Sequence, residues 1–240
     1  MSRPRIAALD LARTAALLGM VAYHFVYDLA LFNFLPPRQP FTPFWKGLAV
    51  LTAGSFLFLA GVSLHLAHAR GLRWPAFRAR LLRILAAALL ITVVSYLYMP
   101  DRFIHFGILH AIATASVIGL AFLRVPVWGV ILAAIAAFFA PNVLTSDFFS
   151  PDYWHWTGLA PKARPALDFV PLFPWIAPFL AGMAVSKAAT NTGLWTALQS
   201  RATPSRAMRI LAWPGRHTLI IYLLHQPLLV GLVAGAAALV

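Results

Sequence analysis

Residues 9–28 have the sequence LDLARTAALLGMVAYHFVYD, and this stretch decides the fold. Its length and apolar composition predict a helix that spans a bilayer. Four of its residues are polar groups that a bilayer disfavours, at a cost of about 2.5–3.5 kcal/mol for each charge: Asp10, Arg13, His24 and Asp28. At about 100° per residue they lie along one stripe, with Arg13 and His24 about 16 Å apart along the axis. An interfacial Asp10–Arg13 pair beside a core histidine would not explain this stripe, so we expect it to be functional.

The composition is that of a polytopic membrane protein. The chain has 240 residues, 61% hydrophobic and 10% charged, and we expect residues 1–240 to form a single domain. The absence of cysteine excludes disulfides, thiolate metal sites and an acyl-cysteine intermediate, and we expect no bound metal. The first helix is too long and too polar for a cleavable signal peptide. The net charge of +13 is explained by membrane topology rather than by nucleic-acid binding.

Seven apolar stretches predict an all-α polytopic membrane bundle with about seven transmembrane spans, at residues 7–31, 46–66, 80–99, 104–123, 126–144, 169–187 and 216–238. The segments 67–83 and 187–216 each contain five basic residues and lie on one side if the spans alternate. With Arg3, Arg5, Arg13 and Arg124, fourteen of the nineteen basic residues lie on that side. Basic residues concentrate on the cytoplasmic side, so we expect an N-in, C-out arrangement.

Three more polar side chains fall in or beside the later spans. His110 ends the stretch FIHFGILH, Asp168 precedes FVPLFPWIAPFLAG, and His225 lies in GRHTLIIYLLHQP. On the predicted topology they share the outer half of the bundle with His24 and Asp28, and these five residues are the predicted catalytic set. The inner half carries a basic rim. This asymmetry indicates an anionic ligand that enters from the cytoplasm and chemistry that occurs toward the outside.

The segment around Asp168 predicts irregular backbone. Pro171, Pro174 and Pro178 cannot all lie in one regular helix, because each removes a backbone donor. Broken helices persist in membranes where protein or a wet cavity satisfies the freed groups. We therefore expect this span to border a cavity with Asp168 at its mouth. The preceding loop, 145–168, is rich in aromatic residues, which is typical of a membrane-surface segment or a lid and also suits stacking on sugar rings.

These residue types favour one kind of chemistry. A histidine backed by a carboxylate is the arrangement of a general base, because the carboxylate orients the imidazole and stabilises its protonated form. The chain has no cysteine and no serine in a nucleophile-elbow setting. Direct transfer of a group to an acceptor hydroxyl or amine is therefore simpler than a covalent relay.

The opening span resembles a known superfamily. Its Leu-Asp-x-x-Arg start and the ten residues between Arg13 and His24 are similar to the transmembrane acyltransferase superfamily, with Thr14 in place of the usual glycine. Within that superfamily the chain looks most like bacterial relatives of heparan-α-glucosaminide N-acetyltransferase. The supporting blocks are HFVYDL (24–29), FLFLAGVSL (56–64), FIHFGILHAI (103–112), DFVPLFPW (168–175) and GRHTLIIYLLHQP (215–227).

The resemblance implies an enzyme of the bacterial inner membrane that takes an acetyl or other acyl group from cytoplasmic acetyl-CoA or another acyl-CoA. The acceptor would be an amine or hydroxyl of an extracytoplasmic molecule such as a sugar. By the same match His24 is the catalytic histidine, and Arg13 with Asp10 would help to hold the donor. We expect His24, oriented by Asp28 or Asp168, to take the acceptor's proton. Either His110 or His225 would donate a hydrogen bond to the developing oxyanion.

Other functions fit part of the pattern. A proton-coupled membrane transporter could use the same intramembrane histidine and aspartate groups as a proton relay. A haem-binding electron carrier could use His24, His110 and His225 as ligands. A purely structural membrane protein would leave the polar stripe unexplained. The sequence does not identify the acceptor or the acyl chain, and it is compatible with a homo-oligomer.

Overall fold

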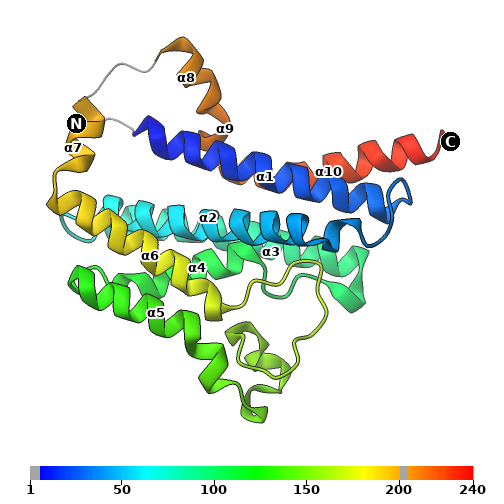
Figure 1. The fold of residues 1–240 in the computed structure, drawn as a ribbon, viewed down its shortest axis with the longest axis horizontal. Helices are drawn as coiled ribbons and strands as arrows, with labels where there is room; N and C mark the ends of the chain where they lie inside the picture. The colour runs from blue at the N-terminus through cyan, green and yellow to red at the C-terminus, as the bar shows by residue number, and fades with distance from the viewer. Residues whose placement is uncertain (1–5, 201–204, 240) are drawn as a thin grey trace. The chain divides into compact units, whose positions relative to one another are not determined.

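The chain folds into helices, most of them joined by short segments, with one long connection at residues 145–171. A computed structural model describes residues 6–200 and 205–239 (Figure 1). The α-helices are α1 (Ala7–Leu31), α2 (Pro43–His68), α3 (Trp74–Tyr98), α4 (Ile108–Ala121), α5 (Val127–Leu144), α6 (Leu172–Asn191), α7 (Leu194–Ser200), α8 (Arg206–Leu211), α9 (Trp213–Arg216) and α10 (Thr218–Ala237). Short 3-10 turns lie at Gln39–Phe41, Pro100–Arg102, Asp147–Phe149 and Asp152–Thr157. The all-α prediction is confirmed for the described part of the chain.

The predicted spans agree well with these helices. Among the described residues, six helices are long and apolar enough to cross a membrane: α1, α2, α3, α5, α6 and α10. The fourth expected span, 104–123, is a shorter apolar helix, α4, of 14 residues. At about 1.5 Å per residue it reaches about 21 Å, less than the roughly 30 Å of a hydrocarbon core. The N-in, C-out arrangement stays a prediction, and three of its basic residues, Arg3, Arg5 and Arg201, lie outside the described residues.

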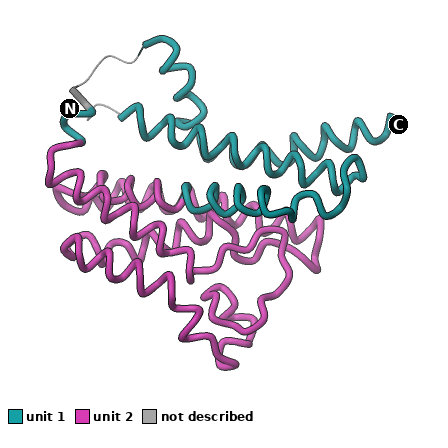
Figure 2. Tube along the Cα trace, in the orientation of Figure 1, with its two compact units in different colours: residues 1–56, 195–240 teal, residues 57–194 magenta. Residues whose placement is uncertain are grey.

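The chain divides into two compact units (Figure 2). Unit 1 comprises Met1–Phe56 and Trp195–Val240, and unit 2 comprises Leu57–Leu194. In unit 1, α10 and the short helices α8 and α9 pack on α1. In unit 2, α6 packs on α5 and α4, and α4 also packs on α3.

In unit 2, α4 is short because the backbone before it is extended. Residues 102–107 pair with residues 167–170: the Leu167 N–H donates to the Arg102 carbonyl at 2.8 Å, and the Val170 N–H donates to the Phe106 carbonyl at 3.0 Å. Hydroxyl groups of α3 satisfy the backbone of Ile104, whose carbonyl accepts from Thr92 at 2.8 Å and whose N–H donates to Ser95 at 2.9 Å. The backbone groups of this extended segment are thus satisfied within the protein.

The prolines of α6 are accommodated as the sequence predicts. Pro171 lies just before the first residue of the helix, and Phe173 has non-helical angles (φ −101°, ψ 134°), so the regular helix continues only after that break. Pro178 lies inside the helix. Further along, Gly182 approaches α2 so closely that an added Cβ would collide with the carbonyl of Phe58. Small residues thus allow close helix packing in this unit.

In unit 1, Thr14 ties α1 to the segment that precedes α10. Its hydroxyl donates to the Leu211 carbonyl at 2.9 Å and accepts from the Gly215 N–H at 3.0 Å. Gly215 lies directly against α1, since a Cβ there would collide with the carbonyl of Asp10. The threonine that replaces the usual glycine of the superfamily therefore joins two parts of the chain that are about 200 residues apart.

We expect Thr14→Val to lower the free energy of unfolding by about 1–3 kcal/mol, because two backbone groups lose their hydrogen-bond partner. Thr14→Ser retains the hydroxyl and is the matched control. Thermal unfolding of the purified protein in detergent measures both variants. Equal melting temperatures for the valine and serine variants would show that the hydroxyl contributes nothing.

Candidate active site

Unit 1 brings three of the predicted catalytic residues together. His24 and Asp28 lie on α1, and His225 lies on α10, which packs along α1. The imidazole rings of His24 and His225 have centroids 5.0 Å apart and meet edge to face at 63°. On the next turn of α1, Asp28 Oδ1 accepts a hydrogen bond of 2.9 Å from Gln226 Nε2. We refer to these four residues as the His–Asp cluster.

Several polar atoms of the His–Asp cluster are buried without a partner. Asp28 has 0% of its surface exposed and His225 has 9%. Among the described residues, Asp28 Oδ2, His225 Nε2 and Gln226 Oε1 have no hydrogen-bond partner. A buried unpaired polar group costs about 1–3 kcal/mol, so such groups are rare in structural positions. Three of them in one cluster favour a site that receives a polar ligand.

The hydrogen bond of His225 fixes its tautomer. His225 Nδ1 lies 2.6 Å from the Tyr222 carbonyl oxygen. A carbonyl oxygen only accepts, so Nδ1 carries the proton and Nε2 carries the lone pair. Neutral His225 can therefore take up a proton at Nε2 but has no donor there, which makes it a poor choice for the predicted donor to an oxyanion.

The carboxylate of Asp28 has a different partner from the one expected. The sequence predicts that Asp28 or Asp168 orients His24, and in the structure the hydrogen bond of Asp28 Oδ1 comes from Gln226. Gln226 is a cluster residue that the sequence analysis missed as a functional group. The available signal was an amide in an apolar helix directly beside a candidate histidine.

In unit 2, His110 uses both ring nitrogens in internal hydrogen bonds. Its Nδ1 accepts from the Gly107 N–H at 3.3 Å, so the proton lies on Nε2. Nε2 is 3.3 Å from Thr92 Oγ1, whose own proton goes to the Ile104 carbonyl, so Nε2 donates to Thr92. This geometry supports a structural role for His110, which holds the extended segment against α3 and the start of α4.

Asp168 also lies in unit 2, half-buried at the start of α4. Its Oδ2 accepts from the Ile108 N–H at 3.0 Å, and a Cβ on Gly107 would collide with the carboxylate. The sequence predicts Asp168 at the mouth of a cavity, whereas the carboxylate accepts from the first residue of α4, just after Gly107 at the N-cap position. Burial raises the pKa of Asp168, partly offset by the bond from Ile108. The geometry supports a positioning role rather than contact with a substrate.

We expect Asp168→Asn to keep its fold and its activity, because the amide oxygen still accepts from Ile108. Because the pKa of Asp168 is raised in the folded protein, the protonated carboxyl stabilises the fold at low pH, and this contribution to the free energy of unfolding is lost as the pH rises through that pKa. The asparagine variant should therefore lose less stability than the wild type between acidic and neutral pH. Thermal unfolding across that range measures the difference. A folded but inactive Asp168→Asn enzyme would instead assign the carboxylate to the chemistry.

At the other end of α1, Asp10 pairs with two arginines. Arg13 Nη1 lies 2.7 Å from Asp10 Oδ1, and Arg216 Nε lies 3.4 Å from Asp10 Oδ2. Asp10 is buried, with 5% of its surface exposed, and the two guanidinium groups are each about a quarter exposed. Two cations share one anion, so the cluster has a formal charge of +1 and can attract an anionic ligand. The sequence predicts Arg13 and Asp10 as this site, and the fold adds Arg216.

No three His, Cys, Asp or Glu side chains of the described residues are grouped so that they could hold a metal ion.

A family model described as heparan-alpha-glucosaminide N-acetyltransferase, catalytic, matches residues 5–227, a range that includes both polar clusters of unit 1. A search of the curated proteins and of the solved structures finds no match. The part of the chain that the structure describes has six apolar helices long enough to cross a bilayer, which together with the family match makes this an integral membrane protein. Since the match covers nearly the whole chain, the protein belongs to the catalytic-domain family of heparan-α-glucosaminide N-acetyltransferase, a family of membrane acetyltransferases.

Proposed function

We propose that the protein transfers an acetyl or other acyl group from a cytoplasmic acyl-CoA to an amine or hydroxyl of a sugar on the other side of a bacterial inner membrane. The observation that carries the proposal is the His–Asp cluster of unit 1. Two imidazoles with centroids 5.0 Å apart lie beside a buried carboxylate, and the His225 Nε2 atom has no partner among the described residues. Such a cluster is built to take up and return a proton.

The transfer needs one general base. In the proposal, His24 removes the proton from the acceptor hydroxyl or amine as that atom attacks the thioester carbon. The new C–O or C–N bond forms and the C–S bond breaks. The imidazolium then returns the proton to the departing thiolate, so the products are the acylated acceptor and free CoA.

The other members of the His–Asp cluster stabilise the protonated imidazole. The Nε2 lone pair of His225 is available to accept a hydrogen bond from the imidazolium of His24, because Nδ1 is held by the Tyr222 carbonyl. The carboxylate of Asp28, one helical turn from His24, adds a negative charge that favours the same form. The amide of Gln226 fixes the orientation of that carboxylate.

The donor is held through its phosphates. Guanidinium groups bind phosphate oxygens through charge-assisted and often bidentate hydrogen bonds. Arg13 and Arg216 supply two such groups, and Asp10 between them fixes their orientation. In this proposal, Asp10 is a positioning residue and the arginines contact the donor.

The test is to incubate the detergent-purified protein with acetyl-CoA labelled in the acetyl group and a panel of mono- and disaccharides. The expected result is labelled sugar and an equal amount of free CoA. If no sugar is labelled, and proteoliposomes instead move an unchanged solute in exchange for protons, the protein is a transporter and the proposal is wrong.

A further inference from the structure

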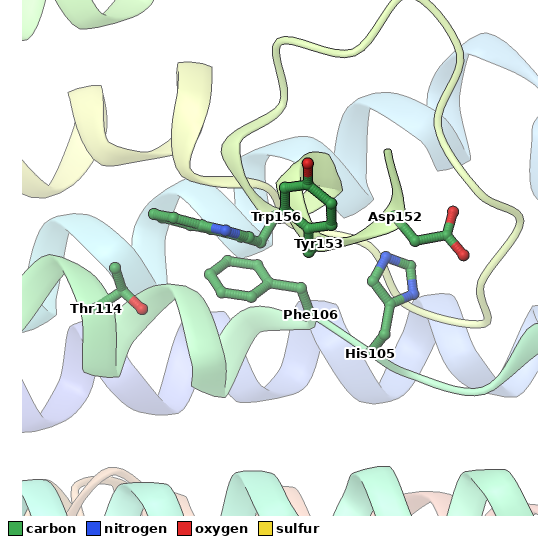
Figure 3. A pocket seen from close by; sticks show the side chains of 6 residues that line it. All are labelled: His105, Phe106, Thr114, Asp152, Tyr153 and Trp156. Carbon is green, nitrogen blue, oxygen red and sulfur yellow. The ribbon is translucent and has the colours of Figure 1, made fainter. Parts of the chain in front are cut away.

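Unit 2 has a pocket between α4 and the loop 145–168, and charges of both signs meet beside it (Figure 3). Its volume is about 440 Å³, and the side chains that line it are His105, Phe106, Thr114, Asp152, Tyr153 and Trp156. Asp152 lies 3.7 Å from His155 and 3.8 Å from Arg164. Near this pocket a carboxylate therefore offsets the charge of the basic residues.

The connection between α2 and α3 carries positive charge without such a carboxylate. Five arginines lie within the segment 70–83, and we refer to them as the basic turn: Arg70, Arg73, Arg78, Arg80 and Arg83. The chain has no acidic residue between Asp28 and Asp101. All members of the basic turn except Arg80 are exposed. The start of α3 thus presents a concentrated positive charge, on the side that the topology predicts to be cytoplasmic.

The other strongly basic segment, 187–216, uses part of its charge inside the protein. Lys187 is buried and its Nζ donates to the Leu123 carbonyl at 2.7 Å, and Arg216 Nε lies 3.4 Å from Asp10 Oδ2. Two cations of that segment therefore have a structural partner. The acyl-transfer proposal also uses Arg216, whereas it uses no residue of the basic turn.

The basic turn is held in a fixed conformation by its neighbours. The buried His68 accepts at Nδ1 from the Arg73 N–H at 3.2 Å, and its carbonyl accepts from the Gly71 N–H at 2.9 Å. The ring of Phe77 contacts those of His68 and Trp74, with centroids 5.9 Å and 6.1 Å away. Because this backbone is ordered before a ligand arrives, binding costs less conformational entropy.

Beyond the basic turn, α3 presents two exposed apolar stripes. The first continues from Arg78 at helical spacing and consists of Leu82, Leu85, Leu89 and Val93. The second continues from Arg83 in the same way and consists of Ala86, Leu90, Val94 and Leu97. Only 17% of the apolar part of α3 is buried. From Arg78 to Leu89 the helix rises about 16 Å, half of the roughly 30 Å of a hydrocarbon core, so each stripe matches an acyl chain of one leaflet.

The side chain of Arg83 bends back toward the start of α3. Its Nε donates to the carbonyl of Ala79, one turn earlier in the helix, at 3.1 Å. A long basic side chain that bends toward the membrane surface keeps its charge at the level of the lipid headgroups. The guanidinium of Arg83 therefore lies closer in depth to Arg78 than the positions of the two residues along the helix would indicate.

We infer that the basic turn and the two stripes of α3 bind one anionic glycerophospholipid. Its headgroup lies beside Arg78 and Arg83, and its two acyl chains lie along the stripes. Guanidinium groups form charge-assisted hydrogen bonds with phosphate, and basic residues at the membrane surface favour a lipid of net negative charge over a zwitterionic one. The inference does not depend on the acyl-transfer proposal, because it uses none of the residues of that proposal.

The test is native mass spectrometry of the detergent-purified protein, titrated with dioleoyl phosphatidylglycerol or dioleoyl phosphatidylcholine. These two probes have the same acyl chains and differ in the charge of the headgroup. We expect the wild type to bind phosphatidylglycerol with a Kd about 25-fold lower than that for phosphatidylcholine, at about 5-fold for each of the two arginines. The double variant Arg78→Gln with Arg83→Gln should bind the two lipids about equally.

Two further variants control for other charges and for misfolding. Arg102→Gln replaces an exposed arginine of unit 2 that follows the opposite end of α3, and it should keep the full preference. Arg78→Lys with Arg83→Lys retains the charge and should keep most of the preference. In a second measurement, phosphatidylglycerol should raise the melting temperature of the wild type and of the double-lysine variant more than that of the double-glutamine variant, because a ligand of the folded state stabilises it.

Competition distinguishes a bound lipid from a bound phosphate compound. Neither glycerophosphoglycerol, which is the deacylated headgroup, nor acetyl-CoA should displace phosphatidylglycerol at equal concentration, because neither covers the two stripes. Displacement by acetyl-CoA that depends on Arg78 and Arg83 would assign the basic turn to the donor and overturn the inference. Equal Kd values for the two lipids in the wild type, or an unchanged preference in the double-glutamine variant, would also overturn it.

Discussion

Replacing His24 by alanine is expected to lower the rate of acyl transfer by about 10²–10⁴-fold, the range of a lost general base. The imidazole of His24 faces that of His225, which is 9% exposed, with ring centroids 5.0 Å apart, next to the bond between Asp28 and Gln226. Removing the ring takes away the proton acceptor but leaves those neighbours in place. The loss should therefore appear in kcat, with little change in the KM for either substrate.

The measurement is a steady-state assay of labelled acetyl transfer, made on variants that elute as the wild type does in size-exclusion chromatography. His217→Ala is the matched control, because His217 is an exposed histidine of unit 1 whose Nδ1 donates to the Trp213 carbonyl and whose ring stacks on that of Trp213. It should keep wild-type activity. Full activity in folded His24→Ala would remove His24 from the mechanism.

The companion variant His225→Ala distinguishes the role of the His225 imidazole from that of His24. If His225 only supports the imidazolium of His24, its loss should be smaller than that of His24. A larger loss in His225→Ala would make His225 the base, which its Nε2 lone pair allows.

Replacing Arg13 by glutamine is expected to raise the KM for acyl-CoA by about 10–100-fold. A hydrogen bond between charged groups contributes about 1.5–3 kcal/mol, which corresponds to that range. Asp10 keeps Arg216 as a partner in this variant, so the fold should survive. The value of kcat should change little, because Arg13 lies about 16 Å along α1 from His24 and does not contact the reacting atoms.

Arg209→Gln serves as the control, since Arg209 is an exposed arginine of α8 in the same unit. It should leave the KM for acyl-CoA unchanged. A phosphate contact also predicts that the wild-type KM rises with salt and that this dependence weakens in Arg13→Gln. Equal KM values in the two arginine variants would remove Arg13 from the donor site.

The sequence was sufficient to predict most of the spanning helices. Long apolar stretches predict spanning helices because the bilayer leaves the backbone few other ways to satisfy its hydrogen bonds. The fourth span was too long in the prediction, 104–123 against Ile108–Ala121. Residues 104–107 were predicted as helix, but Thr92 and Ser95 on α3 and the extended residues 167–170 supply the hydrogen bonds that hold this segment extended. Hydropathy does not show which groups of another element will hydrogen-bond a segment, so it could not reveal these partners.

The sequence by itself determined which ionisable side chains the first helix carries and on which face of that helix they lie. Helical periodicity put Arg13, His24 and Asp28 on one stripe of α1, because side-chain direction along a helix follows from residue spacing alone. Only the tertiary structure decided which polar groups are engaged internally. His110 and Asp168 bind backbone or hydroxyl groups of unit 2, whereas His225 Nε2, beside His24, has no partner among residues 6–200 and 205–239. The physical reason is that a hydrogen bond is satisfied by whatever lies within about 3 Å in space, and spacing along a chain does not set that distance.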